Sequence, residues 1–350
     1  MRFMQKQYIL RLPTSSLLNM VTVALAGAAS GFGLTMLRTF VHLNSTATNP
    51  HKLVLLSRSE KPDLAALGVE VRPVDYANHS QLVEALKDVH TLLSVIGGSL
   101  EAMRDAQLAL IDAAKEVGIK RFAPSEYACI SNDNIDLYRP KAEAWEATKK
   151  AASETGMEIT SFQCGIFMSA FATGTTKPLT EVGRREGAKT GEEEALAGLR
   201  PWNFVVNMRG GTADLPADGT TPIVFTEMRD IATFVYHALS LDAWPKVMGM
   251  RGDVKSYREM LAIVERVQGR KFLVKENSVD DMTAQAAGNP SMSFYNQVRC
   301  ALTEGWGVVP DTLNKAFPDL HPTTCEEFVK KWWNDVEVGE ASWGEDQTFM

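Results

Sequence analysis

Short apolar runs alternate with amphipathic segments along the first half of the chain. Six apolar runs are predicted to be strands: Val21–Ala26, Lys52–Leu56, Val69–Val74, Thr91–Ile96, Lys120–Ala123 and Ile159–Gln163. Between them, apolar residues at helical spacing predict helices over Gly33–Leu43, Ser80–Lys87, Leu100–Val117 and Lys141–Thr155. Strands that alternate with helices are typical of βαβ units. The pattern therefore predicts an α/β fold, a Rossmann-type doubly wound parallel sheet with helices on both faces.

The second half of the chain has a less regular pattern. Residues 175–200 are polar and glycine-rich, which predicts a mobile loop or lid, and Gly210–Asp218 is expected to be a turn region. Helices are predicted over Thr226–Leu239, Ser256–Gln268 and Thr324–Asp335, and a strand is predicted over Phe272–Lys275.

These changes of pattern divide the chain of 350 residues. Residues 1–20 are expected to be a loose extension, or the result of a start site placed too early, because Met20 directly precedes the first strand. Their basic, acid-free composition with Ser15 and Ser16 leaves a targeting segment as the alternative. Residues 21–165 are expected to form the dinucleotide-binding domain. Residues 166–340 are expected to form mainly a smaller α/β substrate domain, with segments around 220–255 returning to the Rossmann sheet.

The first predicted strand leads into a glycine-rich turn, Gly27-Ala28-Ala29-Ser30-Gly31-Phe32-Gly33. Glycine permits a sharp exit from the strand, a close approach of a pyrophosphate to the backbone, and close packing of the helix on the strand. The following helix would direct its free N–H groups at the phosphates. The turn therefore predicts a dinucleotide site, and its expected contact residues are Gly27, Ala29, Ser30, Gly31, Phe32 and Gly33.

The distribution of charge favours NADPH as the dinucleotide. The whole chain carries −7, but no Asp or Glu precedes Glu60, so the first 59 residues carry +6. A site for NAD usually has an acidic residue about 20 residues beyond the glycines, which binds the ribose 2′-hydroxyl. Here Ser57, Arg58 and Lys61 follow the second strand, and they offer a hydroxyl and two cations for a 2′-phosphate.

Two further groups follow predicted strands at the carboxyl edge of the sheet, where ligands bind in such folds. Asp75, after the third strand, is expected to accept a hydrogen bond from the adenine amino group. Gly97 and Gly98, after the fourth strand, would give the nicotinamide-side ribose access to the backbone.

Composition excludes several other classes of protein. The acidic net charge argues against nucleic acid as the main partner. The four cysteines are widely spaced, which favours a reduced, cytoplasmic environment, and the six histidines show no metal-ligand spacing. No apolar run reaches the ~18 residues of a membrane span. We expect a monomer or homodimer that acts on a small molecule.

The segment Lys120-Arg121-Phe122-Ala123-Pro124-Ser125-Glu126-Tyr127 resembles the strand-five signature K-R-F-x-P-S-E-[FY] of the isoflavone reductase-like, or NmrA-like, family. These proteins are atypical short-chain dehydrogenases/reductases. The resemblance continues to about residue 335, and it implies a Rossmann domain with a smaller substrate domain. Many members reduce small aromatic or quinonoid metabolites with NADPH, whereas NmrA-type regulators bind a dinucleotide as a redox sensor without turnover.

The glycine turn departs from the family pattern G-x-x-G-x-x-G, because Ser30 stands at the place of the middle glycine. The spacing Gly27-x-x-x-Gly31-x-Gly33 matches the ordinary short-chain dehydrogenases instead. Their Tyr-x-x-x-Lys motif is absent, however, since Lys141 follows Tyr138 by three residues and not four. The atypical assignment is therefore kept.

The resemblance also implies a catalytic lysine on the helix before strand six, about three turns before the terminal glycine of that helix. Counting back 11 residues from Gly156 reaches Trp145, so Lys141 and Lys149, each one turn away, are the two candidates. We favour Lys141.

The chemistry that follows is carbonyl reduction. A lysine near the cofactor supplies positive charge and a proton, directly or through a hydroxyl. Tyr138 and Tyr127 are the nearby hydroxyls, and Ser125 is expected to orient the nicotinamide or the substrate. Gln163 and Phe167, at the end of strand six, are expected to line the pocket. We therefore predict an NADPH-dependent reductase of a small, aromatic or polyketide-like carbonyl, quinone or enone, with the redox-sensing regulator as the alternative.

Overall fold

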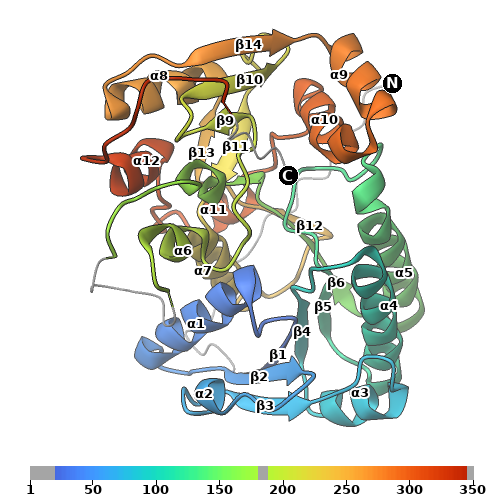
Figure 1. Cartoon of the computed structure of the whole chain (residues 1–350). Coiled ribbons are helices and arrows are strands. Elements are labelled where there is room, and N and C mark those ends of the chain that lie inside the picture. The colour runs from blue at the N-terminus through green and yellow to red at the C-terminus, as the bar shows by residue number, and fades with distance from the viewer. Residues whose placement is uncertain (1–19, 180–187, 345–350) are drawn as a thin grey trace.

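The first six strands form one parallel sheet, as the alternating pattern predicts. This computed structural model describes residues 20–179 and 188–344. The sheet has the order β3-β2-β1-β4-β5-β6 (Figure 1). Its strands are β1 (Thr22–Ala26), β2 (Lys52–Ser57), β3 (Glu70–Pro73), β4 (Thr91–Ser94), β5 (Arg121–Ala123) and β6 (Glu158–Ile159). The reversal of strand order between β1 and β4 creates the crevice in which doubly wound folds bind their ligands.

Helices cover both faces of this sheet, so the predicted doubly wound architecture is confirmed. One face carries α1 (Gly31–Thr46) and α7 (Met228–Ala238), and the other carries α3 (His79–Leu86), α4 (Leu100–Val117) and α5 (Arg139–Thr155) (Figure 1). The short helix α2 (Pro62–Ala65) and the 3-10 turn η1 (Asp136–Tyr138) lie in the connections.

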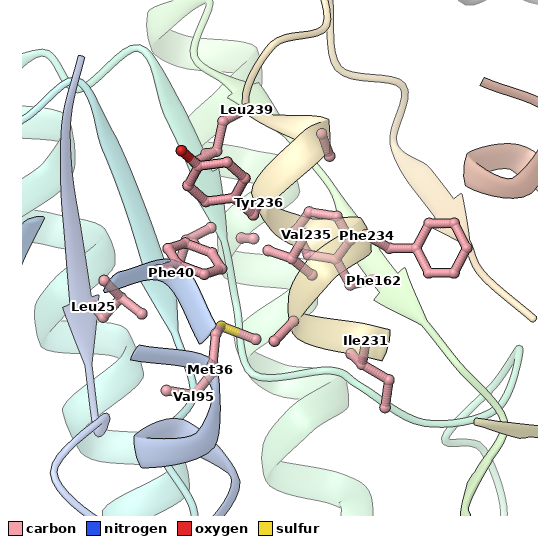
Figure 2. Close-up of a cluster of buried hydrophobic side chains, with 14 of the residues drawn as sticks. Leu25, Met36, Phe40, Val95, Phe162, Ile231, Phe234, Val235, Tyr236 and Leu239 are labelled. Atoms are coloured by element: carbon pink, nitrogen blue, oxygen red, sulfur yellow. The ribbon is translucent and has the colours of Figure 1, made fainter. Parts of the chain in front are cut away.

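Strand β1 shows why the sheet needs both layers of helices. Val23 and Leu25 belong to the hydrophobic cluster under α1 and α7, while Ala24 and Ala26 belong to the cluster on the other face. Figure 2 shows the first cluster, in which side chains of α1, α7 and the sheet meet. Because all four side chains are fully buried, neither face of the strand tolerates a polar residue.

The remaining strands form smaller sheets that pack beside the parallel one (Figure 1). One has the order β14-β10-β9, a second β13-β11-β8, and β12 pairs in parallel with β7. Their strands are β7 (Ser161–Gln163), β8 (Ile166–Phe167), β9 (Val206–Asn207), β10 (Thr212–Pro216), β11 (Ile223–Thr226), β12 (Val247–Gly249), β13 (Asp253–Lys255) and β14 (Leu273–Asn277). The helices of this half are α6 (Gly191–Leu196), α8 (Tyr257–Gln268), α9 (Val279–Gly288), α10 (Pro290–Thr303), α11 (Thr312–Ala316) and α12 (Cys325–Trp333), with the 3-10 turn η2 (Met168–Ala172). The boundary near residue 165 between two domains stays a prediction.

Three sequence predictions need correction. The expected turn region Gly210–Asp218 contains strand β10, whose five residues are all buried and pair with β14. Residues 175–200 are expected to form a loop, but Gly191–Leu196 of this segment form helix α6. Residues 180–187 lie outside the described residues. The expected single strand Ile159–Gln163 divides at Thr160, because its first part pairs with β5 and its second part with β12.

The sequence pattern did not predict strand β10, because the strand has a buried carboxylate, Asp214, at its centre. Asp214 forms an ion pair with Arg299 of α10 at 3.1 Å, and it accepts hydrogen bonds from Tyr295 and Asn277. The Arg299 side chain has 0 % exposure and also donates to the carbonyls of Asp214 and Leu215. A buried charge needs such partners, and this network joins β10, β14 and α10.

No helix within residues 20–179 and 188–344 is long and apolar enough to cross a membrane.

The substitution Asp214→Ala tests how much this network contributes to the free energy of unfolding. It leaves the Arg299 guanidinium buried without its counter-charge, so we expect the free energy of unfolding to fall by about 3–5 kcal/mol. Urea unfolding followed by circular dichroism measures this change. The matched control is Glu84→Ala, which removes an exposed ion pair with Lys87 and is expected to cost less than about 1 kcal/mol. Equal losses for the two variants would contradict the assignment of the network as a buried anchor.

Candidate active site

The glycine turn between β1 and α1 is forced by backbone contacts. Gly27 has φ +86°, and a Cβ there would lie 2.8 Å from both the Cα and the N of Ile96. A Cβ on Gly33 would lie 2.6 Å from the carbonyl oxygen of Gly27. Ser30 precedes α1 without capping it, and the first turn of α1 holds no acidic residue. The N-terminus of α1 thus presents free N–H groups and a positive dipole end to a ligand.

A large cleft of about 1380 Å³ runs along the carboxyl edge of the parallel sheet, over the glycine turn. Most residues predicted for the site line this cleft, although they come from separate parts of the chain. They are Gly27, Ala29, Ser30, Gly31, Phe32 and Gly33 of the turn, Ser57, Arg58 and Lys61 after β2, Gly97 and Gly98 after β4, and Ser125, Lys141 and Phe167.

Three predicted residues do not line the cleft. The carboxylate of Asp75 accepts the N–H of Ala77, and its neighbour Tyr76 lines the cleft in its place. Gln163 is buried and donates to the carbonyl of Ile130. Tyr138 lines a second cavity beside the cleft.

Tyr76 lines the cleft near the basic residues that follow β2. Its hydroxyl donates to the carbonyl of Leu56 at 3.1 Å, and burial raises the pKa of Tyr76 to about 12. Tyr76 therefore stays neutral, and the cations of this end of the cleft, Arg58 and Lys61, face no phenolate.

The second cavity has a volume of about 280 Å³ and a mainly apolar lining. Tyr127 and Phe167 line both cavities, so the second cavity opens beside the end of the cleft at which they lie. Tyr138, Trp202 and Phe204 add aromatic faces, and the rings of Trp202 and Phe204 lie 4.5 Å apart. A flat apolar molecule fits such walls better than a charged or strongly hydrated one.

Lys141 lies at the meeting point of strand β5 and helix α5. It belongs to the first turn of α5, and its Nζ donates to the carbonyl of Ser125 at 2.5 Å and to that of Glu126 at 2.6 Å. Its ammonium also lies 5.5 Å from the centre of the Tyr138 ring. Burial lowers the pKa of Lys141, and the carboxylate of Glu126 opposes this effect.

Lys149, the other candidate from the sequence, points away from the cavities. It pairs with Glu146 of the same helix at 2.6 Å, and its side chain is 37 % exposed. It lines neither the cleft nor the apolar cavity. Position therefore separates the two lysines and leaves Lys141 as the one that can reach a ligand.

Sequence reasoning missed the segment Gly198–Arg200, which completes the cleft from the other half of the chain. Gly198 lies against the glycine turn, because a Cβ on it would lie 3.1 Å from the Cα of Gly31. Arg200 lines both cavities. The preceding helix α6 is anchored by Glu194, which pairs with Arg229 of α7 at 2.8 Å. No sequence signal marks this segment, since its role depends on tertiary contacts alone.

Tyr127 has a strained backbone, because its φ of +37° is rare for a residue with a side chain. Its ring packs edge-on against Phe32 at 5.1 Å and is stacked over Phe162 at 5.9 Å. Burial raises its pKa, so the hydroxyl stays protonated. The strained backbone sets this ring between the two cavities.

Comparison with known proteins fits this geometry. The model of the NmrA-like family matches residues 39–329. The chain belongs to the NmrA-like family. The matched region includes Lys141 and the lining of the apolar cavity, while the glycine turn precedes it.

Two curated relatives of this NmrA-like protein are named as an oxidoreductase and a reductase. Oxidoreductase BOA1 of Botryotinia fuckeliana is 27 % identical over 330 residues, which cover 91 % of this chain and 100 % of the relative. Phenylcoumaran benzylic ether reductase IRL1 of Ginkgo biloba is 38 % identical over 308 residues, which cover 82 % of this chain and 88 % of the relative.

Among solved structures, the binary complex of leucoanthocyanidin reductase with NADPH from Vitis vinifera has the same fold as this NmrA-like chain. The TM-score is 0.65 at 19 % identity, and the match covers 89 % of this chain and 99 % of that one.

Proposed function

We propose that this protein is an NADPH-dependent reductase of a small, aromatic or polyketide-like metabolite with a carbonyl, quinone or enone group. One observation carries the proposal. A half-buried lysine, Lys141, stands on the wall of a dinucleotide-sized cleft at the end where that cleft adjoins an apolar, aromatic-lined cavity. The names of the relatives support the same chemistry, since they are oxidoreductases and reductases.

The residues of the cleft fit NADPH. The close approaches at Gly27 and Gly33 leave a cradle without side chains, and a diphosphate would lie there at the N-terminus of α1. Arg58 and Lys61, with the Ser57 hydroxyl, would hold the 2′-phosphate. Gly97 and Gly98 leave open space, because a Cβ on either would meet nothing within 4 Å. A ribose would lie in that space.

When bound, the cofactor supplies a hydride from C4 of its nicotinamide to the substrate carbon. Lys141 then gives one proton to the alkoxide that develops on the substrate oxygen, and its amine takes a proton back from water. Two of the three N–H groups of the ammonium are held by backbone carbonyls, so the third is left for a ligand. The apolar walls of the second cavity exclude water and strengthen the field of the ammonium.

The apolar cavity also favours a reductase over a redox sensor. A sensor needs the dinucleotide cleft but has no use for an aromatic-lined cavity beside it. Purified protein mixed with NADPH and a panel of quinones, enones and aromatic carbonyls tests this choice. NADPH oxidation supports the reductase, whereas tight binding of both redox forms without turnover would support the sensor.

The variant Lys141→Met is expected to lower kcat at least about 100-fold, because it removes the proton donor. The Kd for NADPH, measured by fluorescence titration, should stay nearly unchanged. The matched control is Lys149→Met on the same helix, which should keep the activity of the natural protein. Full activity of the Lys141 variant, or an equal loss in the control, would contradict the assignment.

The variant Arg58→Ala tests the preference for NADPH. Hydrogen bonds to a charged group contribute about 1.5–3 kcal/mol, so the Kd for NADPH should rise roughly 10- to 150-fold. The Kd for NADH should not change, since NADH lacks the 2′-phosphate. Arg266→Ala, on the distant helix α8, is the control of equal charge. An equal rise in the Kd for NADPH and for NADH would contradict the assignment of Arg58 to the 2′-phosphate.

A further inference from the structure

Glu126 has a carboxyl group whose burial the proposed reaction does not yet explain. The residue follows β5, lines the cofactor cleft and is only 7 % exposed. Its Oε2 accepts a hydrogen bond from the Asn132 side chain at 2.8 Å. Its Oε1 is buried and has no hydrogen-bond partner within the part of the chain that the structure describes. A buried carboxylate with an unpaired oxygen is costly, so such a group calls for a reason.

The same residue also holds Lys141. The backbone carbonyls of Ser125 and Glu126 accept two hydrogen bonds from the Lys141 ammonium. These bonds hold the ammonium at the backbone of the residue that carries the carboxylate, and both residues line the same cleft. Opposite charges in such a site attract each other with little screening. Burial raises the pKa of Glu126, while Lys141 and Asn132 oppose that effect. Each charged form thus stabilises the other against the cost of burial.

Among the described residues, Glu126 is the carboxylate that raises the pKa of Lys141. Tyr138 of η1, Tyr127 and Cys129 after β5, and Cys164 after β7 also lie in this region, and burial raises the pKa of each. They are neutral at ordinary pH. From α4, Lys115 pairs with Glu154 near the end of α5. Asp105 and Asp112 of the same helix line the cleft, where Asp105 pairs with Arg104 and Asp112 raises the pKa of Lys115.

We propose that Glu126 is the positioning residue that keeps Lys141 protonated, so that the lysine enters each reaction cycle with a proton to give. The role in catalysis rests on the proposed function, whereas the charge coupling itself does not. Glu126 touches no reacting atom and acts only through Lys141.

The consequence is a shift in the pH dependence. The protonated lysine is the active form in reduction, so kcat falls as the pH rises through the pKa of Lys141. Glu126→Gln keeps the shape of the side chain but removes its charge, and the pKa of Lys141 must then fall. We expect the alkaline limb of the kcat–pH profile to move to lower pH by about one unit or more, with an unchanged Kd for NADPH at pH 6.

Three companion variants make the test specific. Glu126→Asp retains the charge and should keep most of the natural profile. Glu143→Gln, which changes an exposed carboxylate on α5, is the matched control and should leave the profile unmoved. If the Glu126→Gln variant does not fold, Asn132→Leu replaces it. That variant removes the hydrogen bond to Oε2, favours protonation of Glu126, and should move the limb in the same direction by a smaller amount.

An NMR titration separates this inference from the proposed function. The protein carries lysine labelled with ¹³C at Cε, and the Lys141 signal is the one that Lys141→Met removes. We expect this signal to titrate at lower pH in Glu126→Gln than in the natural protein, whether or not any substrate is turned over. A shift without turnover would refute the reductase but support the coupling. An unmoved Lys141 titration, or an unmoved alkaline limb, would overturn the coupling.

Discussion

The fold depends on two close backbone contacts, at Gly27 and Gly33, that leave no room for a side chain. At the end of β1 the backbone of Gly27 touches Ile96, which follows β4, and Gly33 of α1 packs onto Gly27 itself. A Cβ on Gly33 would push α1 away from the end of β1, and a Cβ on Gly27 would clash with the backbone that follows β4. Because the contact holds, α1 begins directly behind β1 at the point where the strand order reverses. The same contact leaves the floor of the cleft bare and directs the N–H groups of α1 into it.

The second half of the protein supplies the segment that lies against the glycine turn. Gly198 lies against Gly31, so the chain that leaves α6 closes one side of the cleft and carries Arg200 between the two cavities. After β5, the backbone carbonyls of Ser125 and Glu126 fix the ammonium of Lys141. A dinucleotide cleft and an apolar cavity therefore meet beside one fixed cation. This arrangement suits the proposed hydride transfer, in which charge develops on a substrate oxygen inside an apolar cavity.

Local signals in the sequence were sufficient for the first half of the fold. The glycine turn and the β-branched runs specify their own backbone, so β1, β2, β4 and α1 could be located within a few residues. Strand β10 could not, because its buried Asp214 is acceptable only with Arg299, which lies 85 residues later. The choice between Lys141 and Lys149 is similar. Both fit the helical spacing, and only the packing of α5 decides which one reaches the cleft. The roles of Glu126, Gly198 and Arg200 likewise depend on neighbours that are distant in sequence.

The proposed reaction requires the nicotinamide to lie where the cleft meets the apolar cavity, beside Lys141. A crystal structure of the protein with NADP⁺ tests this requirement most directly. We expect the diphosphate at the N-terminus of α1, the 2′-phosphate on Arg58, and the nicotinamide ring next to the apolar cavity, with the Lys141 ammonium beside the ring on the substrate side. A dinucleotide bound with its nicotinamide far from Lys141, or facing solvent away from the apolar cavity, would contradict the proposed reaction.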